Sequence, residues 1–76
     1  MALVSKITHQ ALQVHVGHLD ADCTYDVVTD PAGRKYLQLD TYGSSQRMIL
    51  KKKSQSIRFS PEALAQLKKI LITNNL

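Results

Sequence analysis

Cationic and aromatic side chains are interleaved with apolar ones in two strand-like segments of the chain, residues 35–42 and the basic residues 51–59, which end in Ile57-Arg58-Phe59. Successive side chains of a β-strand point to opposite faces, so Leu37, Leu39, Ile57 and Phe59 would share one face, together with Lys53 and Gln55. The other face would carry Tyr36, Gln38, Asp40, Tyr42, Lys52, Ser54, Ser56 and Arg58. Further cations lie at the ends of these segments and in the neighbouring loops. The candidate site consists of Arg34, Lys35, Tyr36, Gln38, Tyr42, Arg47, Lys51, Lys52, Lys53 and Arg58.

Such a face has the chemistry that a single-stranded nucleic acid requires. Phosphates need positive charge, and unstacked bases need flat aromatic surfaces, on which each stacked base gains about 1–3 kcal/mol. The same composition also fits an ordinary solvated sheet face, and Asp40 lowers its positive charge. The residues alone leave both interpretations open.

Charge is distributed unevenly along the chain. Residues 1–33 contain one lysine and four aspartates, a net charge of −3, whereas residues 34–76 contain nine lysines and arginines and two carboxylates, a net charge of +7. This asymmetry predicts an anionic partner, with nucleic acid first and a membrane surface second. A basic surface that only aids solubility is the alternative.

The spacing of apolar residues predicts several strands followed by one helix. Residues 11–16, 23–29, 35–42 and 51–59 have strand-like alternation or are rich in β-branched and aromatic residues. Residues 30–33 and 43–46 have turn chemistry. Ser60 is a suitable N-cap before Pro61, and apolar residues then recur at helical spacing as far as Leu71. We therefore expect an α+β fold, an antiparallel sheet with a C-terminal amphipathic helix packed on one face and the other face open.

One domain is expected over residues 1–76, with residues 1–22 as an N-terminal strand or arm, residues 23–59 as the strands and residues 60–74 as the helix. A chain of this length buries only about 60% of its unfolded surface and is marginal when it folds alone. Cys23 is the only cysteine, so an intrachain disulfide is impossible. We therefore expect a homo-oligomer in a reducing compartment.

The sequence contains no apolar run near the ~20 residues needed to span a bilayer, and no pattern of a signal peptide. We expect a cytoplasmic, nucleoid or nuclear protein that is not secreted and has no membrane partner.

Potential metal ligands gather near one loop, but their pattern does not support a metal site. They match no familiar zinc spacing and include a single thiol, so loop polarity explains them better. A nucleophilic role for the thiol lacks an orienting partner. We expect no metal, no cofactor and no enzymatic activity. The residues concerned are His15, His18, Asp20, Asp22 and Cys23.

Residues 33–42 read Gly-Arg-Lys-Tyr-Leu-Gln-Leu-Asp-Thr-Tyr, and residues 51–68 contain a basic run, an Ile-Arg-Phe strand and a Ser-Pro-Glu helix start. This pattern resembles the transcriptional coactivator family of the positive-cofactor-four type over about residues 24–71. The resemblance implies a four-stranded curved antiparallel sheet and a dimer formed through the helices, with single-stranded DNA on the sheet face away from them. By position, it assigns Tyr42 to the family's aromatic, Lys51, Lys52 and Lys53 to its basic loop, and Arg34 and Lys35 to its basic strand entry.

Together these features predict a dimeric module that binds single-stranded nucleic acid, DNA in preference to RNA, in transcription regulation or in DNA protection and remodelling. The alternative is a small protein-interaction module, an inhibitor or a regulatory subunit, whose basic sheet face binds an acidic protein.

Overall fold

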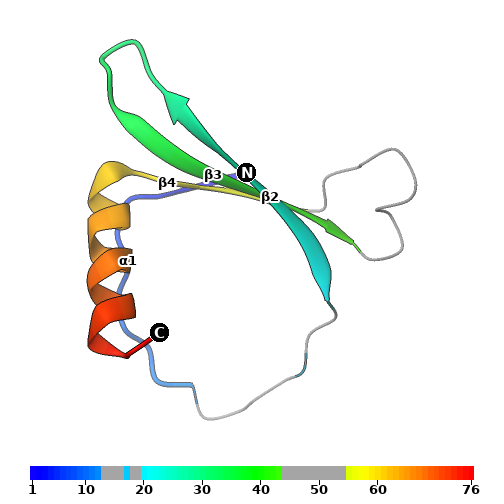
Figure 1. Ribbon diagram of the computed structural model, residues 1–76, viewed down its shortest axis with the longest axis vertical. Helices are drawn as coiled ribbons and strands as arrows, with labels where there is room; N and C mark the ends of the chain where they lie inside the picture. The colour runs from blue at the N-terminus through cyan, green and yellow to red at the C-terminus, as the bar shows by residue number, and fades with distance from the viewer. Residues whose placement is uncertain (13–16, 18–19, 44–54) are drawn as a thin grey trace.

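A four-stranded mixed sheet and one C-terminal helix form an α+β fold (Figure 1). The computed structural model describes residues 1–12, 17, 20–43 and 55–76. The strand order is β1-β4-β3-β2, so β1 and β2 are the two edges of the sheet. The elements are β1 (Ala2–Val4), β2 (Ala21–Thr29), β3 (Lys35–Gly43), β4 (Gln55–Phe59) and α1 (Pro61–Thr73).

The β2–β3 hairpin confirms the turn predicted at residues 30–33. The Asp30 carboxylate accepts hydrogen bonds from the backbone N–H groups of Ala32 and Arg34, both at 2.9 Å. Gly33 has φ 87°, a left-handed conformation that a residue with a Cβ rarely adopts. Asp30 at the first position and Gly33 at the last thus close the hairpin: the aspartate accepts backbone N–H groups of the turn, and the glycine adopts the positive φ.

The strand register assigns each residue to a face of the sheet. Leu37 and Leu39 lie opposite Phe59 and Ile57, whereas Gln38 lies opposite Arg58. This confirms the alternation predicted for residues 35–42 and 55–59; residues 51–54 lie outside the described part of the chain. We call one side the apolar face: Tyr25, Val27, Leu37, Leu39, Ile57 and Phe59. We call the other side the polar face: Tyr36, Gln38, Asp40, Tyr42, Ser56 and Arg58.

β1 corrects the predicted all-antiparallel sheet. It pairs with β4 in parallel, and its register places Ala2 opposite Ile57 and Val4 opposite Phe59. The Ser60 N–H donates to the Val4 carbonyl at 3.0 Å, which extends this pairing to the start of the helix. A three-residue strand is too short to show a hydrophobic period, so the pattern did not reveal it. Of the strand predicted at residues 11–16, residues 11 and 12 are not in a strand and residues 13–16 lie outside the described part.

Both ends of α1 are capped, and Ser60 is the N-cap that the sequence predicts. The Ser60 Oγ accepts the Ala63 N–H at 3.1 Å, and Pro61 occupies the first turn. At the other end Asn75 has φ 56°, and the Leu76 N–H donates to the Leu71 carbonyl at 2.9 Å. These bonds satisfy backbone groups that a helix end leaves without intrahelical partners.

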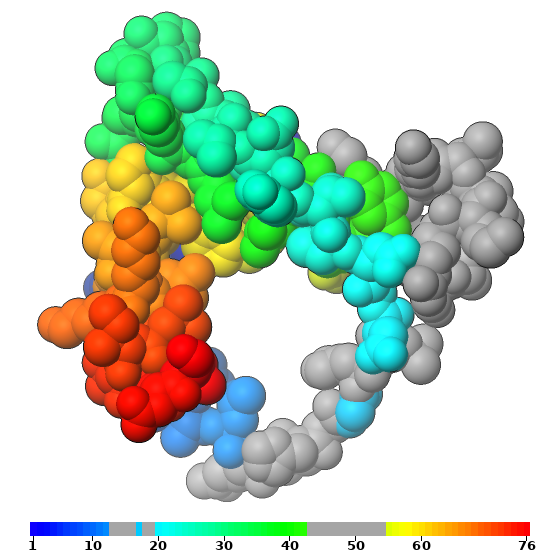
Figure 2. Space-filling view, viewed as in Figure 1, coloured from blue at the N-terminus to red at the C-terminus, as the bar shows by residue number. Residues whose placement is uncertain are grey.

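The helix stands to one side of the sheet, and its axis leads away from the strands (Figure 1). The N-terminal segment runs beside it: the Gln66 side chain exchanges two hydrogen bonds with the Ile7 backbone, at 2.9 and 3.2 Å. In the described part of the chain, Ala63 is the only fully buried apolar residue. Figure 2 shows an opening between α1 and the strands.

Candidate nucleic-acid interface

The predicted site residues separate into three groups. Four lie on the polar face: Tyr36, Gln38, Tyr42 and Arg58. Arg34 precedes β3, and Lys35 begins β3 on the same side as Leu37, which places its ammonium group away from the polar face. The other four lie outside the described residues: Arg47, Lys51, Lys52 and Lys53.

A chain of hydrogen bonds runs across the polar face from β4 to β3. Arg58 donates from Nε at 3.0 Å and from Nη2 to a single acceptor, the Gln38 Oε1. The Gln38 amide nitrogen in turn donates to the Asp40 Oδ1 at 3.2 Å, and the Ser56 Oγ donates to the same oxygen at 2.6 Å. These half-buried side chains therefore hold one another in defined positions.

Arg34 joins the hairpin to the start of the helix. Its Nη2 lies 2.7 and 2.9 Å from the two Glu62 carboxylate oxygens, and its Nε donates to the Tyr36 hydroxyl at 3.4 Å. The hydrogen bond from Arg34 lowers the pKa of Glu62, and the bonds to Tyr36 and Glu62 raise the pKa of Arg34. The charge of Arg34 is thus already balanced by a carboxylate.

Tyr36 is held on its other side by Asp30. The tyrosine hydroxyl donates to the Asp30 Oδ2 at 3.1 Å, and the Arg34 guanidinium carbon lies 6.0 Å from the ring centroid. The Arg34 backbone N–H is the main cause of the lowered pKa of Asp30, and the Tyr36 hydroxyl lowers it further. These contacts orient the aromatic ring without any ligand.

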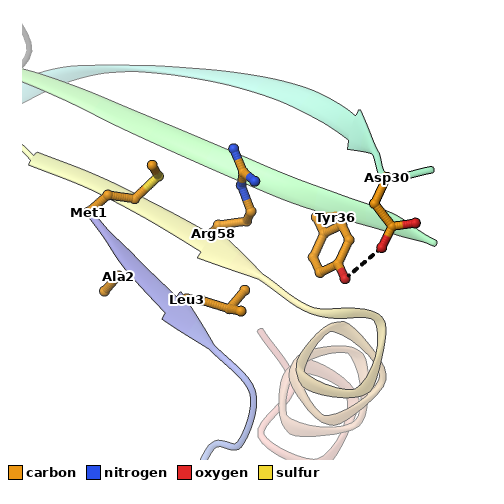
Figure 3. Close-up of a pocket in the computed structure, with 6 residues that line it drawn as sticks. All are labelled: Met1, Ala2, Leu3, Asp30, Tyr36 and Arg58. Atoms are coloured by element: carbon orange, nitrogen blue, oxygen red, sulfur yellow. Dashed lines mark hydrogen bonds between the residues drawn. The ribbon is translucent and has the colours of Figure 1, made fainter. Parts of the chain in front are cut away.

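Tyr36 and Arg58 line one hollow on the polar face, with β1 as its other wall (Figure 3). Its volume is about 370 Å³, at the lower end of the ~300–1,000 Å³ typical of small-molecule sites. Leu3 lies opposite Arg58 in the register and is 60% exposed. The hollow thus combines a cation, an aromatic ring, apolar surface and, at one end, the Asp30 carboxylate that bonds Tyr36. Its lining residues are Met1, Ala2, Leu3, Asp30, Tyr36 and Arg58.

Charge on the polar face differs between its two sides. Arg58, near the β1 edge, makes no ion pair within the described residues. Near the other edge, Asp22 and Asp26 of β2 lie opposite Tyr42 and Gln38, and so add two carboxylates that the sequence analysis did not place there. The length of the connection between β2 and β3, residues 30–34, could have predicted this register, because it determines which residues of the two strands face each other.

The described residues contain no group of three or more His, Cys, Asp or Glu side chains arranged to hold a metal ion. His15 and His18 lie outside those residues. Cys23 is exposed on the apolar face of β2, opposite Thr41. Across the part of the chain that the structure describes, no helix has the length and apolar character needed to cross a membrane.

No protein-family model, curated protein or solved structure matches this chain.

Proposed function

We propose that this protein is a dimeric module that binds single-stranded nucleic acid, with DNA as the expected ligand, through the polar face of its sheet. One observation carries the proposal: Arg58, which has no ion pair among the described residues, lines the same hollow as the oriented Tyr36 ring. A phosphate and an unstacked base need these two groups side by side.

In the proposed complex, Arg58 binds a phosphate and one base occupies the hollow beside Tyr36 and Leu3. Arg34 holds the hairpin to the helix start and orients Tyr36 instead of binding a phosphate, since its bonds to Glu62 and Tyr36 already engage its guanidinium group. The Asp26 carboxylate repels a phosphodiester, so the strand follows the β1–β4 side of the face rather than β2. Lys51, Lys52 and Lys53 precede β4 in the sequence and add charge for the same ligand.

The proposal includes a second copy of the chain, because one copy buries very little apolar surface. Several large apolar side chains remain exposed, Tyr25 by 75%, Val27 by 54% and Ile72 by 78%. The radius of gyration of 14.6 Å exceeds the ~11 Å of a compact domain of this length. A second copy that covers α1 and the apolar face would supply the core that a chain of this size needs.

Fluorescence anisotropy tests the proposal, using labelled single-stranded and duplex oligonucleotides over a salt series. We expect preferential binding of the single strand, with log K falling linearly with log salt by about 0.7 for each phosphate neutralised. Replacing Lys51, Lys52 and Lys53 together by alanine should reduce this slope by roughly 2, because up to three phosphate contacts disappear.

Two results would reject the proposal. One is the absence of oligonucleotide binding at low salt, and the other is binding whose affinity does not change with salt. Capture of an acidic protein from nuclease-treated lysate, together with the first result, would favour the protein-interaction module instead.

A further inference from the structure

We infer that Gln38 is a positioning residue that presents one edge of the Arg58 guanidinium to a phosphodiester; this inference rests on the proposed function. The residue pattern predicts Gln38 as a direct contact with nucleic acid. Its hydrogen bonds assign it a different task, which is to hold Arg58 in one orientation.

The geometry determines which edge of the arginine is presented. Nε and Nη2 form one side of the planar guanidinium, and both donate to the Gln38 Oε1. The remaining edge, formed by Nη1 and the second N–H of Nη2, has no hydrogen-bond partner among the described residues. Its two parallel N–H groups match two oxygens of a phosphate, which a lysine ammonium group does not.

Gln38 is itself held in one orientation. Its amide nitrogen donates to the Asp40 Oδ1 at 3.2 Å, so its oxygen must face Arg58. Ser56, on β4 opposite Asp40, donates to the same carboxylate oxygen at 2.6 Å. An amide at this position orients the arginine without neutralising it, whereas a carboxylate would compete with the phosphate for the same charge.

The first test needs no nucleic acid. In NMR spectra of the folded protein, the Arg58 Nε–H should exchange with water more slowly than in the variant Gln38→Leu. Gln10→Leu is the matched control: it makes the same change at an exposed residue that lies outside the sheet and the helix. Equal exchange in the wild type and in Gln38→Leu would overturn the positioning role.

The second test separates charge from orientation by measuring oligonucleotide affinity over a salt series. Arg58→Ala should lower affinity and reduce the salt slope by about 0.7, because one phosphate contact is lost. Arg58→Lys and Gln38→Leu should each lower affinity by roughly tenfold with the salt slope unchanged, because the positive charge stays in both. Arg58→Lys removes the two parallel N–H groups of the guanidinium, and Gln38→Leu leaves them without a fixed orientation. The double variant Arg58→Lys with Gln38→Leu should lose little more affinity than either single variant, because both changes affect the same contact.

The outcomes distinguish this inference from the proposed function. If Gln38→Leu binds as tightly as Gln10→Leu while the wild type binds well, the positioning role is wrong and the proposed function stands. If the wild type does not bind an oligonucleotide, the proposed function is rejected, and so is a phosphodiester as the ligand of Arg58. The exchange measurement still decides whether Gln38 holds Arg58 in one orientation.

Discussion

Val27 and Val28 offer a direct test of whether a second copy covers the apolar face. They are neighbours on the edge strand β2, and the register places Val27 opposite Leu37 on the apolar face and Val28 opposite Tyr36 on the other side. Val27 is 54% exposed in the single chain, whereas Val28 is half-buried. Valine-to-alanine changes at the two positions remove the same atoms and alter strand propensity equally.

The expected effect on association follows from the exposed fraction. Removing two methyl groups costs about 1.6 kcal/mol when they are fully buried, at roughly 0.8 kcal/mol for each group. A second copy would newly bury the exposed 54% of Val27, which amounts to about 0.9 kcal/mol in each chain and ~1.7 kcal/mol in a symmetric dimer. Val27→Ala should therefore raise the dimer Kd by about 20-fold.

Analytical ultracentrifugation over a concentration series measures this change, with Val28→Ala as the control. Val28→Ala should lower the stability of each chain but leave the dimer Kd within a few-fold of the wild type. A wild-type chain that stays monomeric at all concentrations would refute the reasoning, as would equal dimer Kd values for the two variants.

Two further predictions concern the helix start and the hairpin. Ser60→Ala should lower the free energy of unfolding by about 1–2 kcal/mol in denaturant titrations, because the N–H of the buried Ala63 loses its acceptor; an unchanged midpoint would contradict this. The lowered pKa values of Asp30 and Glu62 mean that both bind protons more weakly in the folded state, so stability should fall as the pH drops below about 4. Arg34→Gln should make the acid-induced fall in the thermal unfolding midpoint shallower, and a fall as steep as that of the wild type would count against the Arg34–Glu62 pair.

Local chemistry explains what the sequence predicted well. Ser60 and Pro61 mark the helix start, because capping depends on residue types within one turn. The turn after β2 was predicted from Asp30 and Gly33, whose side-chain acceptor and backbone freedom act within four residues. The alternation along residues 35–42 assigned both faces of β3 for the same reason, since the period of a strand is local.

Long-range pairing accounts for what the sequence did not reveal. The parallel contact of β1 with β4 joins residues more than fifty positions apart, and three residues carry too little pattern to predict it. The wall that Leu3 adds to the hollow was therefore not predicted. Asp26 was known as a charge of the acidic part of the chain, but only the register showed that it lies opposite Gln38.

By itself, the sequence determined the fold class, the helix caps, the hairpin turn and the separation of polar from apolar side chains along β3, because each of these depends on neighbouring residues. The tertiary structure decided which of the charges act together. It paired Arg34 with Glu62, placed Arg58 on Gln38 beside Tyr36, and left Tyr25 and Val27 of the apolar face exposed. The physical reason is that hydrogen bonds and ion pairs depend on distances of about 3 Å between atoms that strand pairing brings together.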